Sequence, residues 1–517
     1  MKEQQNDRNL KPTSTSGIED IVANNYAKIQ ALREKGIDPF PHRFKITHKL
    51  AQAKELPPET HVIVSGRLMS VRIMGKASFA HIKDGTAKMQ AYISRDSIGE
   101  EMYGIFKKLL GVGDFIGIEG KLFITKTGEL TIHAEKLTVL SKAVRPLPEK
   151  FHGLTDPETR YRARYLDLLT NENTRNIFIT RSKIVAAIRS VLNDEGLLEV
   201  ETPILLSQAG GASARPFETF HNAYKNNLVM RIATELPLKK MLIGGFDGAY
   251  EIGRVFRNEG VDTRHNPEFT TLEAYKAYSD YNGMAELLEK IFEKCIAITG
   301  NEVVNYDGKE INIKPPFDRI HLPEAWLKAT GEDIHNVLNG KSFNREALVA
   351  LAKKMKLDLP EDMPAAKLFD NIMDELIVNK LERPAFIMDY PTAITPLAKC
   401  KTGDESIVER FEFFIAGSEL ANAYSELNDP ADQKGRLEEQ MRQKLEEKNG
   451  EVDILDKDFV EAMEYGMPPM GGIGIGIDRL TMIITGNASI REVILFPLLK
   501  PAGAASEEET AEEEQKK

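Results

Sequence analysis

The stretch from Gly248 to Tyr281 reads GAYEIGRVFRNEGVDTRHNPEFTTLEAYKAYSDY and predicts two strands joined by a charged loop. The first strand is expected from about Tyr250 to Asn258 and the second from about Glu268 to Tyr278. Side chains alternate between the two faces of a strand, so every second residue shares one face. An aromatic ring, a glutamate and a tyrosine then lie beside an arginine, which favours a planar, anionic ligand that carries an amino group.

The residues that form this surface come from both strands and from the loop. They are Phe269, Thr271, Glu273 and Tyr275 on one face of the second strand, Arg257 and Glu259 on one face of the first, and Arg264, His265 and Asn266 in the loop. Such a combination is unusual for packing alone, so this stretch is the first candidate for a binding site.

The composition indicates a globular protein of more than one domain. The chain has 517 residues, of which 42% are hydrophobic and 28% charged, and this length exceeds one ordinary domain. The formal net charge of −11 argues against a uniformly basic surface for nucleic acid, although a local basic face is compatible with it. DNA is therefore not an expected partner.

The cysteines and the apolar runs exclude further classes. Cys295 and Cys400 are the only cysteines and lie far apart, which excludes a disulfide framework and a cysteine-based zinc site and favours a reducing compartment. No apolar run approaches the ~18 residues of a membrane span, and the N-terminus lacks the apolar core of a signal peptide. We therefore expect a cytoplasmic protein with no membrane partner.

The character of the sequence changes along the chain and predicts two folded domains of the α+β class. Five short strand-like runs between about His61 and Leu140 predict a small Greek-key barrel of the OB type, with a helix before it. The predicted limits are 1–17 for a disordered N-terminus, 18–148 for the helix and barrel, 149–501 for the large domain and 502–517 for a disordered acidic tail.

The predicted barrel carries Arg72, Phe79 and Gln90 on or beside its first three strands. Barrels of this type bind single-stranded nucleic acid by stacking bases on exposed aromatic rings beside basic groups. The same residues suit a barrel whose Phe79 belongs to the core and whose charges are solvated, so the barrel alone leaves the choice open.

The large domain is expected to begin with a helix and an edge strand. Residues Thr174 to Glu195 predict an amphipathic helix that ends before Gly196. The run LLEVETPIL then predicts a strand whose Pro203 suits only a sheet edge. The two elements are either a core helix and an ordinary edge strand, or they form a contact with a second subunit. An edge strand favours the second alternative because its backbone can pair with a partner.

Two residues that follow are ambiguous on their own. Gly211 permits close approach of the backbone to a ligand. Glu235 lies in the first turn of a predicted helix capped by Thr234, where a glutamate is commonly a solvated partner of the helix dipole.

A second informative stretch, residues 410–429, predicts a hairpin that turns at Ala416 to Ser418. Alternation places on one face Leu420, Asn422, Tyr424 and Glu426. Glu412 and Glu419 lie on opposite sides of the turn, and paired carboxylates near phosphates commonly hold Mg²⁺. An exposed acidic hairpin is the alternative.

The last motif, MPPMGGIGIGIDRLTMIITG at residues 467–486, predicts a strand almost bare of side chains and then a helix. A flat ligand can lie against such a strand. Arg479, next to a predicted N-cap at Asp478, could reach a phosphate or stack on a base. The alternative is a tightly packed junction between strand and helix, with Arg479 in solvent. The glycines do not form a G-x-G-x-x-G unit, and the GKS at Gly340 lacks the first glycine of a Walker loop.

Three of these motifs resemble the signatures of the class II aminoacyl-tRNA synthetases, and specifically of bacterial lysyl-tRNA synthetases. They are, in order, the helix and strand ending at Pro203, the FRNE–loop–RHNPEF unit and GIGIDR. The resemblance covers about residues 18 to 500. It implies an antiparallel catalytic sheet flanked by helices, an OB-fold anticodon-binding domain, a homodimer, and Mg²⁺ bound with ATP.

The resemblance implies a role in ATP binding for many of these residues. Arg257 would hold the α-phosphate and the amino-acid carboxylate, Phe269 would stack on adenine, and Arg479 would close over adenine and the γ-phosphate. Arg257 and Arg479 are therefore the implied catalytic residues. The other implied ATP contacts are Glu259, Arg264, His265, Asn266 and Glu412, and the implied Mg²⁺ ligands are Glu412 and Glu419.

The amino-acid pocket and the anticodon surface complete the expected sites. A buried ammonium requires carboxylate partners, so we expect Glu235 and Glu426 to pair with the ε-ammonium of lysine. The other residues expected around lysine are Gly211, Arg257, Glu273, Tyr275, Asn422 and Tyr424. The residues that the resemblance implies at the anticodon are Arg72, Phe79, Gln90 and Glu129.

The implied reaction is that of a lysine–tRNA ligase, which turns L-lysine and ATP into lysyl-adenylate and pyrophosphate and transfers the lysyl group to the 3′-terminal adenosine of tRNA(Lys). Three alternatives remain. The two glutamates Glu235 and Glu426 argue against an aspartyl- or asparaginyl-type enzyme, since an aspartate-specific one would need cations there. An enzyme that lysylates a protein would lack the barrel. The third is a non-catalytic RNA-binding relative.

Overall fold

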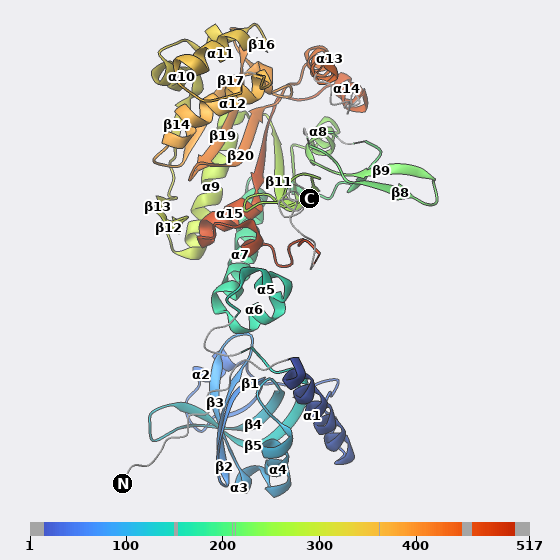
Figure 1. Cartoon of the computed structure of the whole chain (residues 1–517), viewed down its shortest axis with the longest axis vertical. Coiled ribbons are helices and arrows are strands. Elements are labelled where there is room, and N and C mark those ends of the chain that lie inside the picture. Colours follow the sequence, from blue (N-terminus) through green and yellow to red (C-terminus); the bar gives the residue numbers. More distant parts are fainter. Residues whose placement is uncertain are drawn as a thin grey trace, which may run out of the picture. The chain divides into compact units, whose positions relative to one another are not determined.

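The computed structural model describes residues 15–148, 154–208, 210–211, 214–360, 362–446 and 457–501. By contacts the chain divides into two compact units, Met1–Gly153 and Leu154–Lys517, whose elements are labelled in Figure 1. The predicted acidic tail and residues 1–14 of the predicted N-terminal tail lie outside the described residues. The domain limits drawn from the sequence stay a prediction.

The first unit is a closed five-stranded barrel, which confirms the predicted OB-type fold (Figure 1). Its strands pair in the order β1-β2-β3-β5-β4. Their bounds are β1 (His61–Met74), β2 (Ala77–Lys83), β3 (Lys88–Ser94), β4 (Phe115–Ile124) and β5 (Leu130–Ser141). Alternate residues such as Val62, Val64 and Ile82 are fully buried, so the period-two pattern of the sequence becomes the barrel interior.

Four helices in the described part of this unit and a buried ion pair accompany the barrel. The helices are α1 (Thr15–Glu34), α2 (Leu50–Lys54), α3 (Arg95–Ile98) and α4 (Glu100–Leu109). Because α1 begins at Thr15, residues 15–17 are helical, which corrects the end of the predicted disordered segment. Lys142 Nζ lies 2.9 Å from Asp114 Oδ1 with both side chains buried. The amide of Ala143 also donates to that carboxylate, at 2.8 Å.

The second unit is built on a mixed, mainly antiparallel sheet. Its strand order is β14-β17-β19-β20-β21-β11-β10-β6, with β18 paired to β19. Only the end pairs β14–β17 and β6–β10 in that order are parallel. The bounds are β6 (Leu198–Glu199), β10 (Gly248–Phe256), β11 (Glu268–Ala277), β14 (Asp318–His321), β17 (Ala385–Pro391), β18 (Cys400–Lys401), β19 (Asp404–Ile415), β20 (Ser418–Ser425) and β21 (Met470–Gly476).

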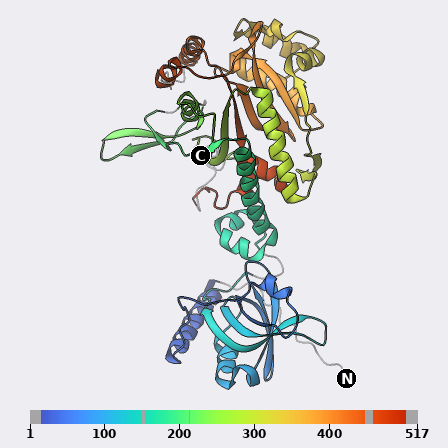
Figure 2. The same cartoon turned by 180° about the vertical axis from the view of Figure 1, so that it is seen from behind.

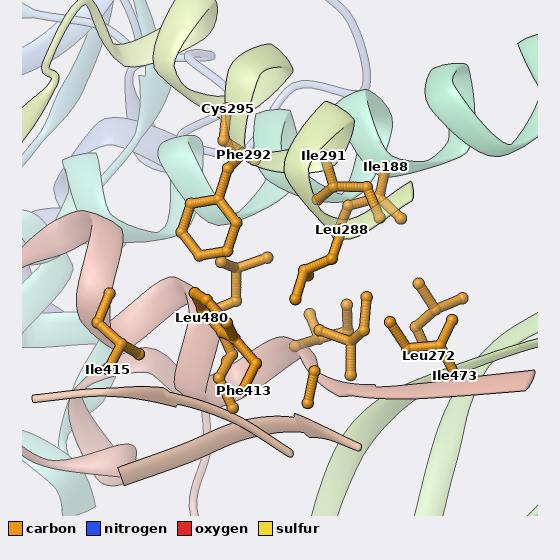
Figure 3. Packing of buried hydrophobic residues seen from close by; sticks show 14 of the residues in the cluster. Ile188, Leu272, Leu288, Ile291, Phe292, Cys295, Phe413, Ile415, Ile473 and Leu480 are labelled. Atoms are coloured by element: carbon orange, nitrogen blue, oxygen red, sulfur yellow. The ribbon is translucent and has the colours of Figure 1, made fainter. Parts of the chain in front are cut away.

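One face of this sheet is covered by α7 (Glu172–Asp194), α9 (Tyr281–Thr299) and α15 (Ile477–Thr485), with α9 crossing the strands in Figure 2. Figure 3 shows Leu288 and Phe292 of α9 above Phe413, Leu272 and Ile473 of the sheet. All five side chains are almost fully buried. Because side chains alternate in a strand, the residues between these core positions point to the opposite face.

The remaining elements form the flanks of the second unit. Their bounds are α5 (Pro157–Arg162), α6 (Arg164–Thr170), β7 (Leu205–Leu206), β8 (Glu218–His221), β9 (Asn226–Met230), α8 (Glu235–Ile243), β12 (Val303–Tyr306), β13 (Lys309–Asn312), α10 (Leu322–Thr330), η1 (Ile334–Val337), β15 (Leu338–Asn339), β16 (Ser342–Phe343), α11 (Arg345–Lys354), α12 (Ala365–Leu376), η2 (Val378–Lys380), η3 (Thr392–Ile394), α13 (Pro430–Glu446), α14 (Lys457–Glu464) and α16 (Ile490–Val493). Among the elements from α10 to α12, Trp326 and Phe369 stack with ring centroids 5.0 Å apart. They belong to a hydrophobic cluster that is separate from the one under α9.

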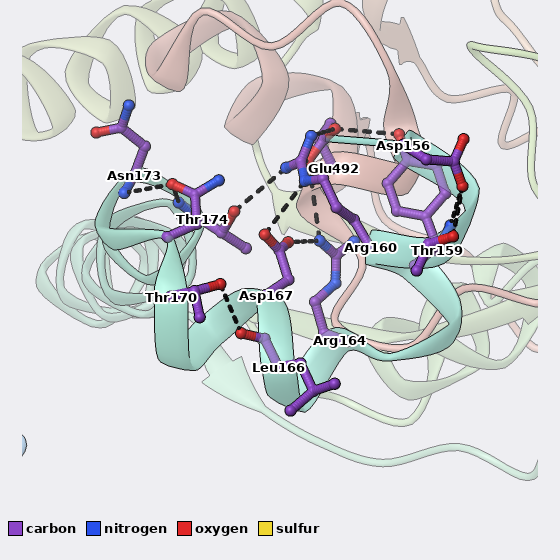
Figure 4. A network of polar contacts seen from close by, with 12 residues as sticks. Asp156, Thr159, Arg160, Arg164, Leu166, Asp167, Thr170, Asn173, Thr174 and Glu492 are labelled. Carbon is purple, nitrogen blue, oxygen red and sulfur yellow. Dashed lines mark hydrogen bonds and ion pairs between the residues drawn. The ribbon is translucent and has the colours of Figure 1, made fainter. Parts of the chain in front are cut away.

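A buried polar network ties α5 and α6 to α16 (Figure 4). Arg164 is fully buried, and its guanidinium contacts Asp167 Oδ2 at 2.8 Å and donates to the carbonyl of Arg491 at 2.7 Å. Arg160 pairs with Glu492 at 2.9 Å. Each buried charge therefore has a partner, and the network fixes the chain that follows α15.

Three local predictions are corrected. Pairing of β10 with β11 ends at Phe256, because Pro267 has no N–H to continue the ladder, so Arg257 and Glu259 lie in the loop and not on the strand. The strand predicted over LLEVETPIL is not continuous: only β6 joins the large sheet, and Leu205 begins β7 of another sheet. Asp478 is not the N-cap of α15, which begins one residue earlier; its carboxylate instead accepts from the Thr270 amide at 2.7 Å.

Candidate active site

The face of the sheet opposite α9 carries a cavity of about 480 Å³. Except for Glu412, every residue predicted to bind ATP or lysine lines it. These residues are Gly211, Glu235, Arg257, Glu259, Arg264, His265, Asn266, Phe269, Glu273, Tyr275, Glu419, Asn422, Tyr424, Glu426 and Arg479. Their roles stay predictions, but the fold brings them to one place.

The glycines of β21 form the floor between two strands that carry side chains. Gly474 pairs with Glu273 of β11 on one side and with Asn422 of β20 on the other. Gly472 pairs in the same way with Tyr275 and Tyr424. A Cβ at Gly474 would lie 3.0 Å from Glu273 Oε1, and one at Gly472 would collide with Tyr275 and Glu426. Side chains on this strand would therefore fill the space that a flat ligand needs.

The loop after β10 brings Arg257 back towards β11. The Arg257 amide donates to the carbonyl of Pro267 at 2.9 Å, and the guanidinium lies 5.3 Å from the centroid of the Phe269 ring. The cation and the aromatic ring thus line the cavity side by side. This arrangement suits an adenine nucleotide, whose base would stack on the ring and whose α-phosphate would meet the guanidinium.

Asp262 shapes the charged loop. Its carboxylate accepts hydrogen bonds from the amides of Arg264 at 2.6 Å and His265 at 2.7 Å, and it contacts His265 Nδ1 at 2.8 Å. Burial alone would raise the pKa of Asp262, but these hydrogen bonds lower it to about 2. The turn therefore presents an arginine and a histidine in fixed order, which suits the outer phosphates of a nucleotide.

Arg479 joins this loop to the acidic hairpin. Its Nη1 donates to the carbonyl of Glu419 at 2.6 Å and lies 3.9 Å from the carboxylate of the same residue. Its Nη2 is 3.4 Å from His265 Nε2. The guanidinium therefore sits at the rim where the loop, α15 and β20 meet.

The opposite end of the cavity is acidic and buried. Glu235, Glu273 and Glu426 all line it, and the hydroxyl of Tyr275 donates to Glu273 Oε2 at 3.1 Å. Glu426 is 1% exposed; its Oε2 lies 2.5 Å from Lys239 Nζ, and its Oε1 has no hydrogen-bond donor among the described residues. A buried carboxylate in this state favours the binding of an ammonium group.

The carboxyl groups at this end of the cavity have raised pKa values. Burial, followed by the charge of Glu235, raises the pKa of Glu273 to about 8. Burial raises the pKa of Glu426 to about 8 as well, although the nearby ammonium of Lys239 opposes that rise. An ammonium that enters the cavity would restore the ionised form of both carboxyls.

A β-bulge brings Glu419 to the same face as Glu412. Strict alternation would put Glu419 on the face opposite Asn422, but the register of β19 and β20 shifts so that Phe414 pairs with Glu419 and Glu412 with Asn422. Leu420, in the bulge, is 3% exposed and belongs to the core. The predicted approach of the two carboxylates thus depends on this irregularity.

These two carboxylates fit a divalent cation. Glu412 is held by Arg410 and by the hydroxyl of Tyr390 at 2.9 Å. Burial and then the charge of Glu412 raise the pKa of Glu419 to about 7, despite the arginines nearby. Within the described ranges no group of three or more metal-ligating side chains occurs. Mg²⁺ commonly takes few ligands from a protein and the rest from phosphate and water, so a pair of carboxylates would suit it.

Three residues at the site were missed by sequence reasoning. Lys239 contacts Glu235 and Glu426, and its position one helical turn after Glu235 was a usable signal. Arg410 is buried and donates through Nε to Asn422 Oδ1 at 3.1 Å. Asp262, the third, had no distinctive spacing.

On the barrel, the four residues predicted at the anticodon lie on neighbouring strands. Arg72 pairs in register with Phe79, and the side chain of Gln90 donates to Glu129. Phe79 is half-buried rather than part of the barrel core, and its ring centroid is 5.2 Å from that of Tyr92. The barrel therefore presents aromatic rings beside polar groups, and the anticodon role of the four stays a prediction.

Comparison with known proteins gives two family matches. Residues 156–500 match the model described as tRNA synthetases class II (D, K and N). Residues 62–140 match the OB-fold nucleic acid binding domain.

Similar proteins include lysine–tRNA ligases from several bacteria. The one from Lactococcus lactis subsp. cremoris is 48% identical over 485 residues, which is 92% of this chain and 97% of the relative. The one from Staphylococcus epidermidis is 46% identical over 486 residues, with the same coverage. The one from Halalkalibacterium halodurans is 45% identical over 495 residues, or 94% of this chain and 97% of the relative.

Proposed function

The chain belongs to the class II tRNA synthetases, within them to the lysine–tRNA ligases, and from this membership we propose how its own residues activate and transfer lysine. It is an enzyme that joins L-lysine to tRNA at the expense of ATP. The family matches support the reaction as a whole, and the assignments to single residues are our proposal.

The observation that carries the choice of amino acid is the acidic end of the cavity. Glu235 and Glu426 receive the ε-ammonium, Tyr275 adds a hydrogen bond, and Tyr424 packs against the aliphatic stem. Glu273 and the Gly211 backbone take the α-amino group, and Asn422 lies at the α-carboxylate. A substrate with an acidic side chain would meet carboxylates here, and the ammonium of Lys239 is already paired with both glutamates. An aspartyl- or asparaginyl-type activity is therefore not favoured.

Activation needs positioning and charge neutralisation rather than a general base, because a carboxylate is already a nucleophile at neutral pH. The lysine carboxylate attacks the α-phosphorus of ATP in line, so that an O–P bond forms while the bond to pyrophosphate breaks. Arg257 holds the α-phosphate and the carboxylate together, with Phe269 stacked on adenine. Arg264, His265 and Arg479 face the outer phosphates, with Glu259 at the adenosine end and Asn266 within the loop.

Glu412 and Glu419 hold Mg²⁺ in this proposal. When bound with ATP, the ion neutralises phosphate charge and stabilises the pyrophosphate that leaves. Glu419 lines the cavity and Glu412 does not. Of the two metal ligands, we therefore expect Glu419 to lie nearer to the bound nucleotide.

Transfer follows on the same face of the sheet. A hydroxyl of the terminal adenosine of tRNA(Lys) attacks the carbonyl carbon of lysyl-adenylate, and AMP leaves with the electron pair of the broken anhydride bond. The barrel reads the anticodon through Phe79 as a stacking ring and through Arg72, Gln90 and Glu129 as polar contacts.

We further propose a homodimer in the cytoplasm. The sheet ends at the two-residue strand β6, and apolar residues at and near that edge are exposed, among them Leu198 at 48% and Leu205 at 49%. A partner strand would cover such an edge. In the part of the chain that the structure describes, no helix is long and apolar enough to cross a membrane.

The test is ATP–pyrophosphate exchange with each amino acid in turn. Exchange that depends on lysine, with none above background for aspartate or asparagine, is the expected result. Exchange driven by aspartate or asparagine would refute the substrate assignment, and clean ATP binding without any exchange would indicate a non-catalytic relative.

A further inference from the structure

Behind the acidic end of the cavity lies an ammonium that belongs to the protein itself. Lys239 of α8 is 1% exposed, and its Nζ lies 2.5 Å from Glu235 Oε1 and 2.5 Å from Glu426 Oε2. The contact with Glu426 is an ion pair without hydrogen-bond alignment. Both glutamates line the cavity and Lys239 does not. The ammonium is therefore behind the two carboxylates and leaves their cavity side free.

The position of Lys239 is fixed by its surroundings. It follows Glu235 by four residues on α8, so the two side chains share one helical face. Its Nζ also lies 5.7 Å from the ring centroid of Tyr275 and 5.9 Å from that of Phe459 on α14. These rings hold the cation between two aromatic faces and away from water.

The charged and titratable groups that face this cluster come from several elements. They are Glu235 on α8, Glu273 and Tyr275 on β11, Tyr424 on β20, Glu426 directly after β20 and Arg257 after β10. Despite burial, the two glutamates raise the pKa of Lys239 above its ordinary value, so its ammonium stays charged in the cluster.

Two buried carboxylates this close repel each other when both are charged, and a cation beside them offsets that repulsion. Lys239 cancels one of the two charges and holds one oxygen of each glutamate. Glu235 and Glu426 then keep one net negative charge between them. One substrate ammonium balances that charge, whereas a neutral side chain would leave it buried and unpaired.

We propose that Lys239 is a specificity-determining positioning residue, whose buried ammonium offsets one of the two carboxylate charges of Glu235 and Glu426 and orients both carboxylates for a single side-chain ammonium of the substrate. This inference rests on the proposed function of the cavity. It adds that the pocket is selective because of a charge the protein supplies itself, and not only because of its two glutamates.

The test replaces Lys239 by methionine, which keeps the length and the apolar stem. Its matched control is Lys240→Met, since Lys240 is the next residue of α8 but pairs with the exposed Asp458. The KM values for lysine and for ATP are measured by exchange between pH 6.5 and 9.5. For the unaltered enzyme, the KM for lysine falls as pH rises and levels off once the acidic pair is ionised.

For Lys239→Met we expect that fall to move to higher pH by about one unit or more, which is about a tenfold higher KM for lysine on the acid side. The KM for ATP stays within about twofold, and Lys240→Met follows the unaltered enzyme. If Lys239→Met lowers the melting temperature and kcat but leaves the pH profile of the lysine KM in place, Lys239 is only structural and the inference is overturned.

A second variant keeps the test decisive if Lys239→Met does not fold. Lys239→Met combined with Glu235→Gln removes the ammonium together with one carboxylate. Its lysine KM should be higher at every pH but should level off at the pH seen in the unaltered enzyme. If the KM for lysine of this double variant instead levelled off at a higher pH than in the unaltered enzyme, the inference would be overturned. Failure of the proposed function is separate, because it shows as absent lysine-dependent exchange in the unaltered enzyme.

Discussion

Glu426→Gln is the most direct perturbation of the lysine end of the cavity. The change keeps the size of the side chain and removes its charge. Lys239 would still have Glu235 as a partner, at 2.5 Å, so no buried cation is left unpaired and the fold should persist. The substrate ammonium alone loses a charged acceptor.

The expected magnitude follows from burial. Glu426 is 1% exposed, and a hydrogen bond to a charged group is worth about 1.5–3 kcal/mol. At about 1.4 kcal/mol per factor of ten, the KM for lysine should rise about 10- to 150-fold. The KM for ATP should change little, since in this proposal Glu426 contacts the side chain of lysine and not the nucleotide.

The effect should also depend on pH. Burial raises the pKa of Glu426 to about 8, so below that pH the unaltered enzyme must release a proton before it can pair with the ammonium. Its affinity for lysine therefore improves as pH rises towards 8, while glutamine does not titrate. The ratio of the two KM values should accordingly be larger at pH 8.5 than at pH 6.5.

The assay is lysine-dependent ATP–pyrophosphate exchange at both pH values, with the KM for lysine and ATP measured in parallel. Glu464→Gln, an exposed glutamate on α14, is the matched control and should behave as the unaltered enzyme. A KM for lysine that is the same in Glu426→Gln and in the control at both pH values would refute the assignment of the ε-ammonium to this carboxylate.

Four further outcomes are expected. Phe269→Leu should raise the KM for ATP about fivefold to 150-fold, since a base–aromatic stack is worth about 1–3 kcal/mol, and an unchanged KM for ATP contradicts the stack. Phe79→Ala should raise the KM for tRNA in aminoacylation by a similar factor while exchange stays intact; slower exchange would contradict a role confined to the barrel. Chelation of metal ions should abolish exchange until Mg²⁺ is added back, and Glu419→Gln should raise the Mg²⁺ concentration for half-maximal rate; exchange that survives chelation speaks against the metal. Asp114→Ala should destabilise the barrel by about 3–5 kcal/mol, because Lys142 is left buried without a partner, and urea unfolding that matches the unaltered chain would contradict this.

Much of the site was predictable because strand alternation and glycine content are local properties. Glu273 and Tyr275 share a face for a reason that needs only their spacing of two. The bare strand around Gly472 and Gly474 likewise indicates a floor for a flat ligand from composition alone. The barrel was predictable in kind, although half-exposure of Phe79 required the packed structure.

What the sequence by itself determined is therefore the set of side chains on each strand face, together with the family that their motifs resemble. Only the tertiary structure decided which faces meet and where alternation fails. The bulge at Leu420 turns Glu419 towards Glu412. No local sequence pattern specifies this bulge, because it depends on the packing of Leu420 in the core. Lys239 lies between Glu235 and Glu426, two residues far apart in the chain. Their charges interact strongly only where folding has excluded water, since burial lowers the effective dielectric around them.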